Sequence, residues 1–181
     1  MLVIKEAFND TQLEKVKDLY ESAFPTSEKK PFPMILEKRE EGLAEILSIE
    51  DENRQFCGLL ITALYKDLVL IDYFAIDEES RGSGIGSEVL KLFCNRYGNK
   101  RIFLEIESTV SDKAENHDVK IRRKHFYERN GFGCMSYLVL LFGVEMEIMT
   151  YNGRVSYEEY HELLDKVYGE KISSHVILFK E

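Results

Sequence analysis

The alternation of apolar and polar positions divides the first half of the chain into short strands and helices. Three apolar runs follow one another with only brief polar connections, which is typical of antiparallel strands in a meander. Asp10 or Thr11 can cap a helix whose apolar side chains fall on one side. The elements that this half predicts are strands at 2–6, 43–50, 54–65 and 68–76, the capped helix with its apolar positions between 13 and 23, and a second helix at 33–41.

The second half has the same mixed character. An apolar run at 101–107 predicts a strand, and Ser156 with Glu159 forms a capping-box signature for a helix. The other expected elements are a helix that ends at 130–131, strands at 134–142, 144–151 and 174–179, and a helix as far as about residue 167. With one parallel connection through the turn after residue 76, the pattern predicts an α+β fold with a mostly antiparallel sheet and helices on its faces.

The segment 68–86, LVLIDYFAIDEESRGSGIG, joins an apolar strand to a turn with three glycines and one arginine. The residues that follow have their apolar positions at helical spacing, so strand, turn and helix start are consecutive. Gly82, Gly84 and Gly86 allow backbone conformations that a Cβ would block, and successive N–H groups can therefore converge on phosphate oxygens. The helix start adds further N–H groups, and Arg81 adds a positive charge. The segment thus predicts an anion-binding loop.

Two common nucleotide-binding motifs do not fit this loop. A Walker A loop requires GxxxxGK[ST], and the lysine is absent here. A dinucleotide fingerprint requires GxGxxG, but counting from Gly82 the third glycine position is Ser87. What remains is R-x-x-G-x-G, with Arg81, Gly84 and Gly86, which resembles the acyl-CoA pyrophosphate loop of the GNAT N-acetyltransferase superfamily. The alternative is a plain glycine-rich turn between a strand and a helix.

A second segment carries the same resemblance. RIFLEIE at 101–107 is followed, after a polar stretch, by KIRRKHFYERNGF at 120–132. Together they are similar to the next strand and the tyrosine-bearing helix of the superfamily. Asn130 and Gly131 can end this helix because both accept left-handed backbone conformations.

The resemblance implies a fold and a cofactor site. It implies a single domain of residues 1–181 whose central sheet splays between the strands at 68–76 and 101–107. The co-substrate acetyl-CoA would lie in that gap, its pantetheine arm paired with the main chain of the first strand. The cofactor-binding residues would be Phe74, Ala75 and Ile76 for pantetheine, and Arg81, Gly82, Ser83, Gly84, Ile85, Gly86 and Ser87 for the pyrophosphate.

Acetyl transfer to an amine needs help with two protons. A lysine-like amine has a pKa near ~10.4, so only about one molecule in a thousand is unprotonated at neutral pH. A base is therefore useful, and the departing thiolate benefits from a proton. By its place in the motif, Tyr127 matches the family tyrosine that faces the CoA sulfur as general acid. The alternative is that Tyr127 only packs its helix onto the sheet.

Asp72 is an acid inside an otherwise apolar strand. An unpaired carboxylate in a central strand is costly, so its side chain should face a cavity, water or a cation. Some polyamine acetyltransferases of the superfamily have a carboxylate at the matching place, proposed to accept the amine proton through water. Asp72 is therefore either a base of this kind or an acid paired with a basic side chain.

Glu105 and Glu107 alternate with Phe103 on one face of the next expected strand and predict an acidic pair. A salt-bridged strand end is the simpler interpretation for Glu105. Glu107, nearer the end of the strand, is the better hypothesis for a base or an ammonium ligand, with the same structural alternative.

The tyrosine helix departs from the family pattern in one respect. Lys120 and Arg123 stand where family members often have an asparagine and a small residue, so this chain lacks the asparagine that the resemblance would place in contact with CoA. The basic run Arg122, Arg123 and Lys124 could bind phosphate or an acidic acceptor. A solvated helix face with one buried ion pair is the commoner explanation.

Composition narrows the class of protein. The chain of 181 residues is 44% hydrophobic and 31% charged, which suits one soluble domain with a substantial core. Cys57, Cys94 and Cys134 suggest neither a disulfide framework nor a metal site, and the histidines show no metal-ligand spacing. There is no long apolar stretch and no signal-peptide layout, so a cytoplasmic location is expected. The net charge of −9 argues against nonspecific nucleic-acid binding and mildly favours a cationic acceptor.

We therefore expect a cytoplasmic N-acetyltransferase that uses acetyl-CoA and no metal. A primary amine would attack the thioester directly in a ternary complex, with small cationic amines first among the acceptors and peptide amines next. We expect no nucleic-acid or membrane partner, and a monomer or a homodimer. The alternative, from a different class, is an acyl-CoA-binding regulatory or interaction module without turnover.

Overall fold

The computed structural model describes residues 1–82, 84–110 and 116–180. The chain divides into two compact units that share one strand, β4 (Leu68–Ile76). Unit 1 comprises Met1–Leu64 and Ile71–Gly98, and unit 2 comprises Tyr65–Leu70 and Asn99–Glu181. The expectation of a single domain over 1–181 stays a prediction.

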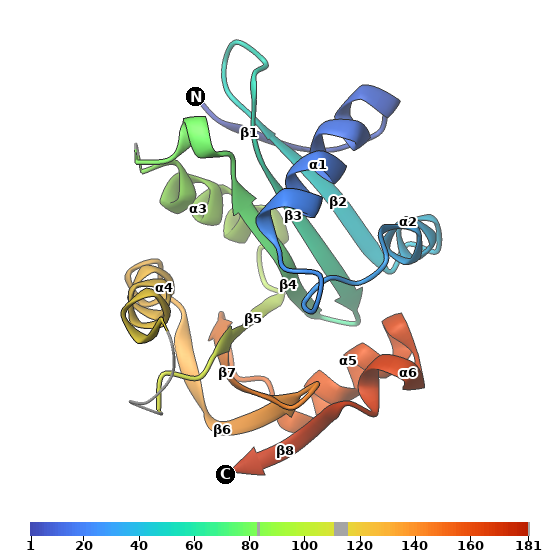
Figure 1. The fold of residues 1–181 in the computed structure, drawn as a ribbon, viewed down its shortest axis with the longest axis vertical. Helices are drawn as coiled ribbons and strands as arrows, with labels where there is room; N and C mark the ends of the chain where they lie inside the picture. Colours follow the sequence, from blue (N-terminus) through green and yellow to red (C-terminus); the bar gives the residue numbers. More distant parts are fainter. Residues whose placement is uncertain (83, 111–115, 181) are drawn as a thin grey trace. The chain divides into compact units, whose positions relative to one another are not determined.

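Unit 1 is a strand meander covered by helices on both faces. Its strands pair in the order β1 (Val3–Glu6), β2 (Ala44–Glu50), β3 (Phe56–Tyr65) and β4, and the pairs of β1 with β2 and of β2 with β3 are antiparallel. Figure 1 shows α1 (Asp10–Ala23) and α2 (Phe32–Glu40) on one face and α3 (Ile85–Tyr97) on the other. The predicted meander is confirmed. A 3₁₀ turn, η1 (Glu78–Ser80), follows β4 and was not predicted.

The core of unit 1 forms where the apolar side of α1 meets the sheet. Val16 and Tyr20 are fully buried there, against Ile46 and Ile61 of the central strands. The cap of this helix differs from the expected one. The side chain of Asn9 accepts a hydrogen bond from the Gln12 amide at 2.9 Å. The prediction of Asp10 or Thr11 as the cap is wrong, because the helix already begins at residue 10.

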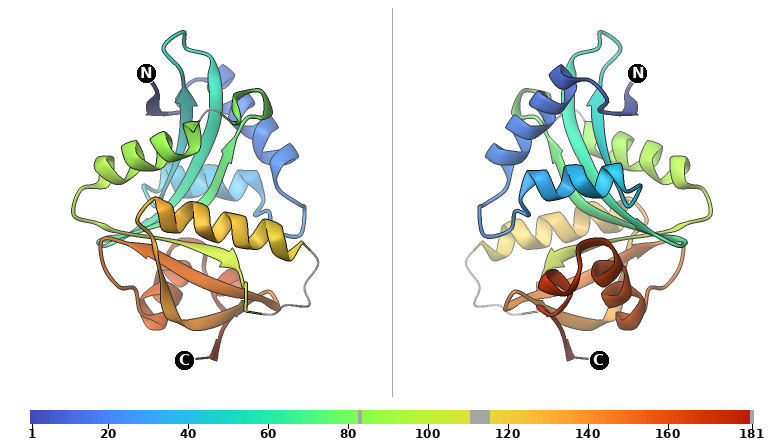
Figure 2. Two further views of the ribbon diagram at one scale, coloured as in Figure 1. Left: turned by 90° about the vertical axis from the view of Figure 1, so that its left-hand side faces the viewer. Right: turned by 90° about the vertical axis from the view of Figure 1, so that its right-hand side faces the viewer.

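Unit 2 continues from the start of β4, where Leu68–Leu70 pair in parallel with the start of β5 (Arg101–Glu107). The order then runs β5, β7 (Val144–Tyr151), β6 (Gly133–Leu141) and β8 (Val176–Lys180), all antiparallel. Helix α4 (His117–Arg129) covers one face, and α5 (Tyr157–Tyr168) and α6 (Glu170–Ser173) the other (Figure 2). The α+β class with a mostly antiparallel sheet and one parallel connection is confirmed.

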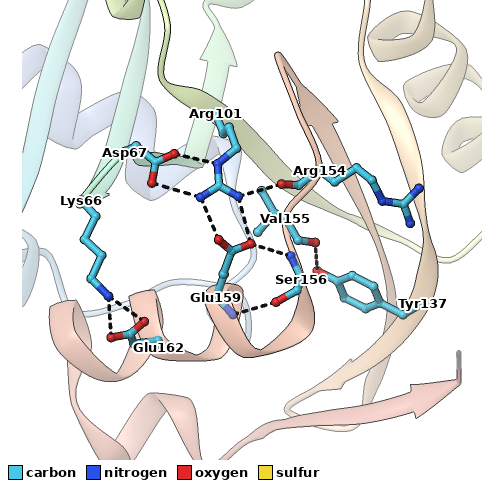
Figure 3. A network of polar contacts seen from close by, with 9 residues as sticks. All are labelled: Lys66, Asp67, Arg101, Tyr137, Arg154, Val155, Ser156, Glu159 and Glu162. Atoms are coloured by element: carbon cyan, nitrogen blue, oxygen red, sulfur yellow. Dashed lines mark hydrogen bonds and ion pairs between the residues drawn. The ribbon is translucent and has the colours of Figure 1, made fainter.

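An arginine fastens the start of both β4 and β5 to α5. Arg101 makes paired contacts with the carboxylate of Asp67, at 2.7 and 3.0 Å, and with that of Glu159, at 2.9 and 2.8 Å (Figure 3). Glu159 also accepts a hydrogen bond from the Ser156 amide at 2.9 Å, which completes the predicted capping box of α5. The two carboxylates fix the guanidinium in the position where the strands join. Within the described residues, every helix is too short or too polar to cross a lipid bilayer.

Candidate functional site

The glycine loop has the backbone conformation that its sequence requires. Gly82 and Gly84 have φ angles of +87° and +79°, in the left-handed region that other residues rarely adopt. Gly84 caps α3, and the first bond of this helix runs from the Ser87 amide to the Gly84 carbonyl at 3.1 Å. The amides of Ile85 and Gly86 precede that bond and point out of the helix end. Ser83, the remaining loop residue expected to bind the pyrophosphate, lies outside the described residues.

Arg81 lies between this loop and the end of β4. Its Nε donates to the Ile76 carbonyl at 3.1 Å, and Nη1 lies 3.6 Å from Glu78 Oε1. The side chain is 56% exposed, so the guanidinium can still meet an anion from solvent. The loop therefore combines helix-end amides with one anchored positive charge.

The main chain of β4 presents different groups on its two edges. The Asp77 amide donates to the Cys57 carbonyl of β3 at 2.8 Å. The Ala75 carbonyl also lies close to β3, since a Cβ added to Gly58 would be only 2.4 Å from its oxygen. Because neighbouring residues of a strand turn their polar groups to opposite edges, Phe74 and Ile76 present theirs on the edge away from β3. The expected contacts of Phe74, Ala75 and Ile76 with pantetheine stay a prediction.

A cavity of about 810 Å³ opens beside the loop, entirely within unit 1. Arg81 and Ile85 line it from the loop, Phe56 from β3 and Leu19 from α1. A contribution of α1 to this cavity was not predicted from the sequence.

Asp72 forms an ion pair with Lys30, a residue of the connection between α1 and α2. Lys30 Nζ lies 2.7 Å from Asp72 Oδ1, and the side chains are 15% and 2% exposed. A carboxylate this buried needs such a partner, since an unpaired buried charge costs about 3–5 kcal/mol. Of the two interpretations of Asp72, pairing with a basic side chain is what the structure shows. Its role as a base stays a prediction.

Lys30 is itself held by aromatic residues of the unit 1 core. Its amide donates to the Tyr73 hydroxyl at 2.9 Å, and its carbonyl accepts from the Tyr20 hydroxyl at 2.7 Å. The ammonium lies 5.3 Å from the centroid of the Tyr73 ring, a cation–π distance. Lys30 is therefore a fixed cation beside Asp72.

Tyr127 lies in the last turns of α4, half-buried. Its ring contacts those of Phe126 and Phe132, with centroids 5.2 and 5.7 Å apart. Burial raises the pKa of Tyr127 to about 12, although the charge of Arg123 acts in the opposite direction. The hydroxyl therefore keeps its proton at neutral pH. As predicted, the helix stops at Asn130 and Gly131: its last residue is Arg129, Asn130 caps it, and Gly131 has a φ of +88°. The Phe132 amide closes the end by donating to the Tyr127 carbonyl.

Glu105 and Glu107 do not form the predicted acidic pair. Tyr160 of α5 donates to Glu105 Oε1 at 2.5 Å, whereas Glu107 makes an ion pair with Lys120 of α4. These helices lie on opposite faces of the unit 2 sheet (Figure 2). The predicted pair assumed that side chains alternate between the two faces along the whole strand. Glu107 is the last residue of β5, where that alternation no longer determines the direction of the side chain. The structural interpretation of Glu105 is confirmed.

The basic run on α4 follows the second interpretation made for it. Arg122 and Arg123 are exposed, whereas Lys124 Nζ lies 2.5 Å from Glu147 Oε2 of β7. The expected buried ion pair is therefore this one.

A comparison with models of protein families shows which family this chain belongs to. The model of the acetyltransferase (GNAT) domain matches residues 42–133, just over half of the chain. This chain belongs to the GNAT acetyltransferases. It is therefore an acetyl-CoA-dependent N-acetyltransferase, and the matched part includes Asp72, the glycine loop, Glu107 and Tyr127.

Solved structures of GNAT proteins share the fold. A GNAT-family protein from Bacteroides thetaiotaomicron aligns with a TM-score of 0.75 at 20% identity, over 92% of this chain and 98% of its own. The spermidine N-acetyltransferase of Vibrio cholerae, in complex with CoA and spermine, aligns at 0.64 and 14%, over 82% and 94%. The ribosomal-protein-S18-alanine N-acetyltransferase of Escherichia coli aligns at 0.61 and 15%, over 87% and 97%. No curated protein sequence matches this chain significantly.

The expected site residues of this GNAT chain fall in both units. Asp72, the β4 edge and the loop belong to unit 1, and Tyr127 and Glu107 to unit 2. Sequence reasoning missed Lys30 and Glu147. Glu147 could have been found, since it is an acid within the apolar strand VEMEIMTY, the same signal that singled out Asp72. Within residues 1–82, 84–110 and 116–180, no three His, Cys, Asp or Glu side chains are grouped so as to hold a metal ion.

Proposed function

We propose that this GNAT chain transfers the acetyl group of acetyl-CoA to a primary amine, by direct attack in a ternary complex. The whole chain, 1–181, would act as one acetyltransferase domain. The family match runs across both units, and the Bacteroides alignment covers 92% of the chain, which supports this proposal. The three cysteines are free thiols, as expected of a protein in the reducing cytoplasm.

The observation that carries the proposal is the strand, glycine loop and helix start of unit 1. Positive φ angles at Gly82 and Gly84 turn the chain into the N-terminus of α3, where the helix-end amides and the helix dipole would favour a diphosphate. Arg81 would add a charge-assisted contact. Main-chain groups of Phe74 and Ile76 would hold the pantetheine arm as a further strand would.

Tyr127 would act as the general acid of the reaction. The amine nitrogen forms a bond to the acetyl carbon, the carbon–sulfur bond breaks, and the departing thiolate takes a proton. A tyrosine whose pKa is raised to about 12 still carries that proton at neutral pH. This supports Tyr127 as the donor.

The proton lost by the attacking ammonium needs an acceptor. We assign it to Asp72, through water, with Lys30 balancing the carboxylate charge, and we hold Glu107 as the second choice. Replacing the true base should lower kcat, because the amine must then lose its proton to bulk water. Asp72→Asn and Glu107→Gln, each compared with the wild type at neutral pH, test this. An unchanged kcat in both variants excludes both carboxylates.

The acceptor class is proposed to be a small cationic amine, including polyamines. The net charge of −9 would attract such a molecule, and the Vibrio cholerae structure of the same fold is that of a spermidine N-acetyltransferase. A peptide amine is the next choice, as the Escherichia coli structure is that of an enzyme acting on a protein alanine.

The test is a thiol-release assay with acetyl-CoA over a panel of amines. The panel would contain spermidine, spermine, simple diamines and short peptides with a free amino terminus, and N-acetylated forms of the same amines serve as controls. We expect saturable release with diamines or polyamines and none with the acetylated controls. Heat on CoA binding without release for any amine would instead favour an acyl-CoA-binding module without turnover.

A further inference from the structure

Helix α4, which carries Tyr127, meets its sheet through charges. None of its residues is buried, so it lacks the apolar stripe that usually fixes a helix on a sheet. Lys120 and Lys124 are four positions apart and therefore lie on one side of the helix. Each meets a carboxylate from the sheet, Lys120 that of Glu107 on β5 and Lys124 that of Glu147 on β7. Two ion pairs thus join α4 to its sheet.

Glu147 is the better enclosed of the two carboxylates. Only 5% of the residue is exposed, and four groups donate to it. The donors are Lys124 Nζ at 2.5 Å, the Thr109 amide and hydroxyl, both at 2.7 Å, and Cys134 Sγ at 3.4 Å. Burial alone would raise the pKa of Glu147, but the bonds from Lys124 and Thr109 outweigh it and the pKa is lowered. The group is therefore a permanent anion at neutral pH.

Tyr127 follows Lys124 by three positions and lies on the same side of α4, one turn further on. Its ring packs against those of Phe126 and Phe132. Ring contacts tolerate small rotations of the helix more readily than a charge-assisted hydrogen bond, which is short and strongly directional. Among the side-chain contacts of α4, the ion pair of Lys124 with Glu147 is therefore a directional restraint one turn from Tyr127.

We propose that Glu147 is a positioning residue for Tyr127, holding α4 through Lys124 in the rotation that directs the tyrosine hydroxyl to the reacting sulfur. This rests on the proposed function, in which Tyr127 protonates the departing thiolate. Glu147 itself touches no reacting group. Because it also binds the Thr109 amide and hydroxyl, it fixes the chain just after β5 to the same point as the helix.

A double-mutant cycle tests the proposal. Glu147→Gln keeps the shape of the side chain and removes its charge, and we expect kcat to fall about tenfold with the KM for acetyl-CoA within twofold. In a Tyr127→Phe background the same change should alter kcat less than twofold, because its effect passes through the tyrosine. Effects that multiply would overturn the proposal, as would an unchanged kcat in Glu147→Gln.

Variants of Lys124 guard against a folding defect in Glu147→Gln. Lys124→Arg keeps a charged donor and should retain kcat within threefold, whereas Lys124→Met should behave as Glu147→Gln does. The control is Glu162→Gln, which removes an exposed ion pair with Lys66 in the same unit and should leave kcat unchanged. Equal losses in the Arg and Met variants would contradict a role for the charge.

Hydrogen exchange of the full chain gives a readout that does not need turnover. Glu147→Gln should speed amide exchange across residues 117–129 and leave α5 unchanged. Unchanged exchange in α4 would overturn the inference even if the enzyme is active. Absence of thiol release from the wild type with every amine would instead overturn the proposed function, so the two failures can be told apart.

Discussion

Tyr127 brings together, in one residue, a retained proton and a fixed environment. Its pKa is raised to about 12 by burial, and two aromatic rings pack against its own. The structural and the catalytic interpretations of this tyrosine are therefore compatible, because the packing that burial requires also keeps the hydroxyl protonated.

For Tyr127→Phe, we expect kcat to fall about 100-fold, the usual range for losing a general acid. The affinity for CoA, measured by calorimetry, should stay within twofold, because the ring packing is retained. The wild-type kcat should show no alkaline loss due to Tyr127 until the pH approaches 12, since the protonated form is the active one. Tyr151→Phe, which alters another ring beside Phe132, is the control. A fully active Tyr127→Phe would exclude the acid role.

The Lys30–Asp72 pair makes a prediction about stability. In Lys30→Met the carboxylate of Asp72, 2% exposed, loses its partner, and the free energy of unfolding should drop by about 3 kcal/mol. Lys29→Met is a matched control at the next residue, because its partner Glu21 is 49% exposed and such a pair contributes less than about 1 kcal/mol.

Urea unfolding measures both variants, and adding Asp72→Asn to Lys30→Met should recover part of the loss. Equal effects of Lys29→Met and Lys30→Met would show that the buried pair is not what stabilises this connection.

At the scale of single residues, the sequence indicates which side chains need a partner, but not which residue the partner is. Asp72 stands out as an acid among apolar neighbours, and the need for a cation follows. That the cation is Lys30, forty-two residues earlier, depends on how the α1–α2 connection folds back onto β4. No local pattern contains that information.

At the scale of elements, the glycine loop gives the sharpest prediction. Valine at position 84 would have to adopt a φ of +79°, which a β-branched residue avoids, and the helix-end amides would move. We expect the Kd for CoA to rise at least about tenfold in Gly84→Val, as seen by calorimetry, since most of the diphosphate contacts would be lost.

Gly42→Val is the control for Gly84→Val. Gly42 has a φ of +73° in the same unit, and like Gly84 it has open space around an added Cβ. Gly42→Val should therefore impose similar backbone strain and change the affinity for CoA less than twofold. If Gly84→Val binds CoA as tightly as the wild type, the phosphate-loop assignment is wrong.

The elements themselves were largely predictable, because apolar periodicity and turn residues are local signals. The runs at 43–50, 54–65 and 68–76 correspond to β2, β3 and β4 within two residues. The elements and contacts that were not predicted correctly have physical explanations. Helix α6 has four residues and η1 three, too few to show a period. The acidic pair of Glu105 and Glu107 was wrong because a strand end is free to turn its last side chain toward another helix.

For the molecule as a whole, the shifted carboxyl groups predict how stability depends on pH. Arg101 holds the pKa of Glu159 below its usual range, and that of Glu147 is lowered by Lys124 and Thr109 despite burial. A group whose pKa is lower in the folded state stabilises fully above its unfolded value of 4.5 and loses this effect as the pH falls through the folded value.

The free energy of unfolding should therefore decline as the pH is lowered from 5 to 3. Urea titrations at each pH measure this decline. The decline should be shallower for Glu147→Gln, which should also be less stable at pH 7 by about 2 kcal/mol, the usual contribution of a charge-assisted hydrogen bond. Glu40→Gln, at the exposed end of α2, should leave the free energy of unfolding at pH 7 within about 0.5 kcal/mol of the wild type. A decline in Glu147→Gln as steep as that of the wild type would contradict the assignment.

The strand β4 has a consequence for how such a protein can diversify. Residues Tyr65–Leu70 belong to unit 2, although the chain on both sides of them belongs to unit 1. No continuous piece of DNA therefore encodes either half, and recombination at a single breakpoint cannot exchange one half for that of a distant relative. We therefore expect new acceptor preferences to come from point substitutions and changes in loop length more readily than from the exchange of a whole half.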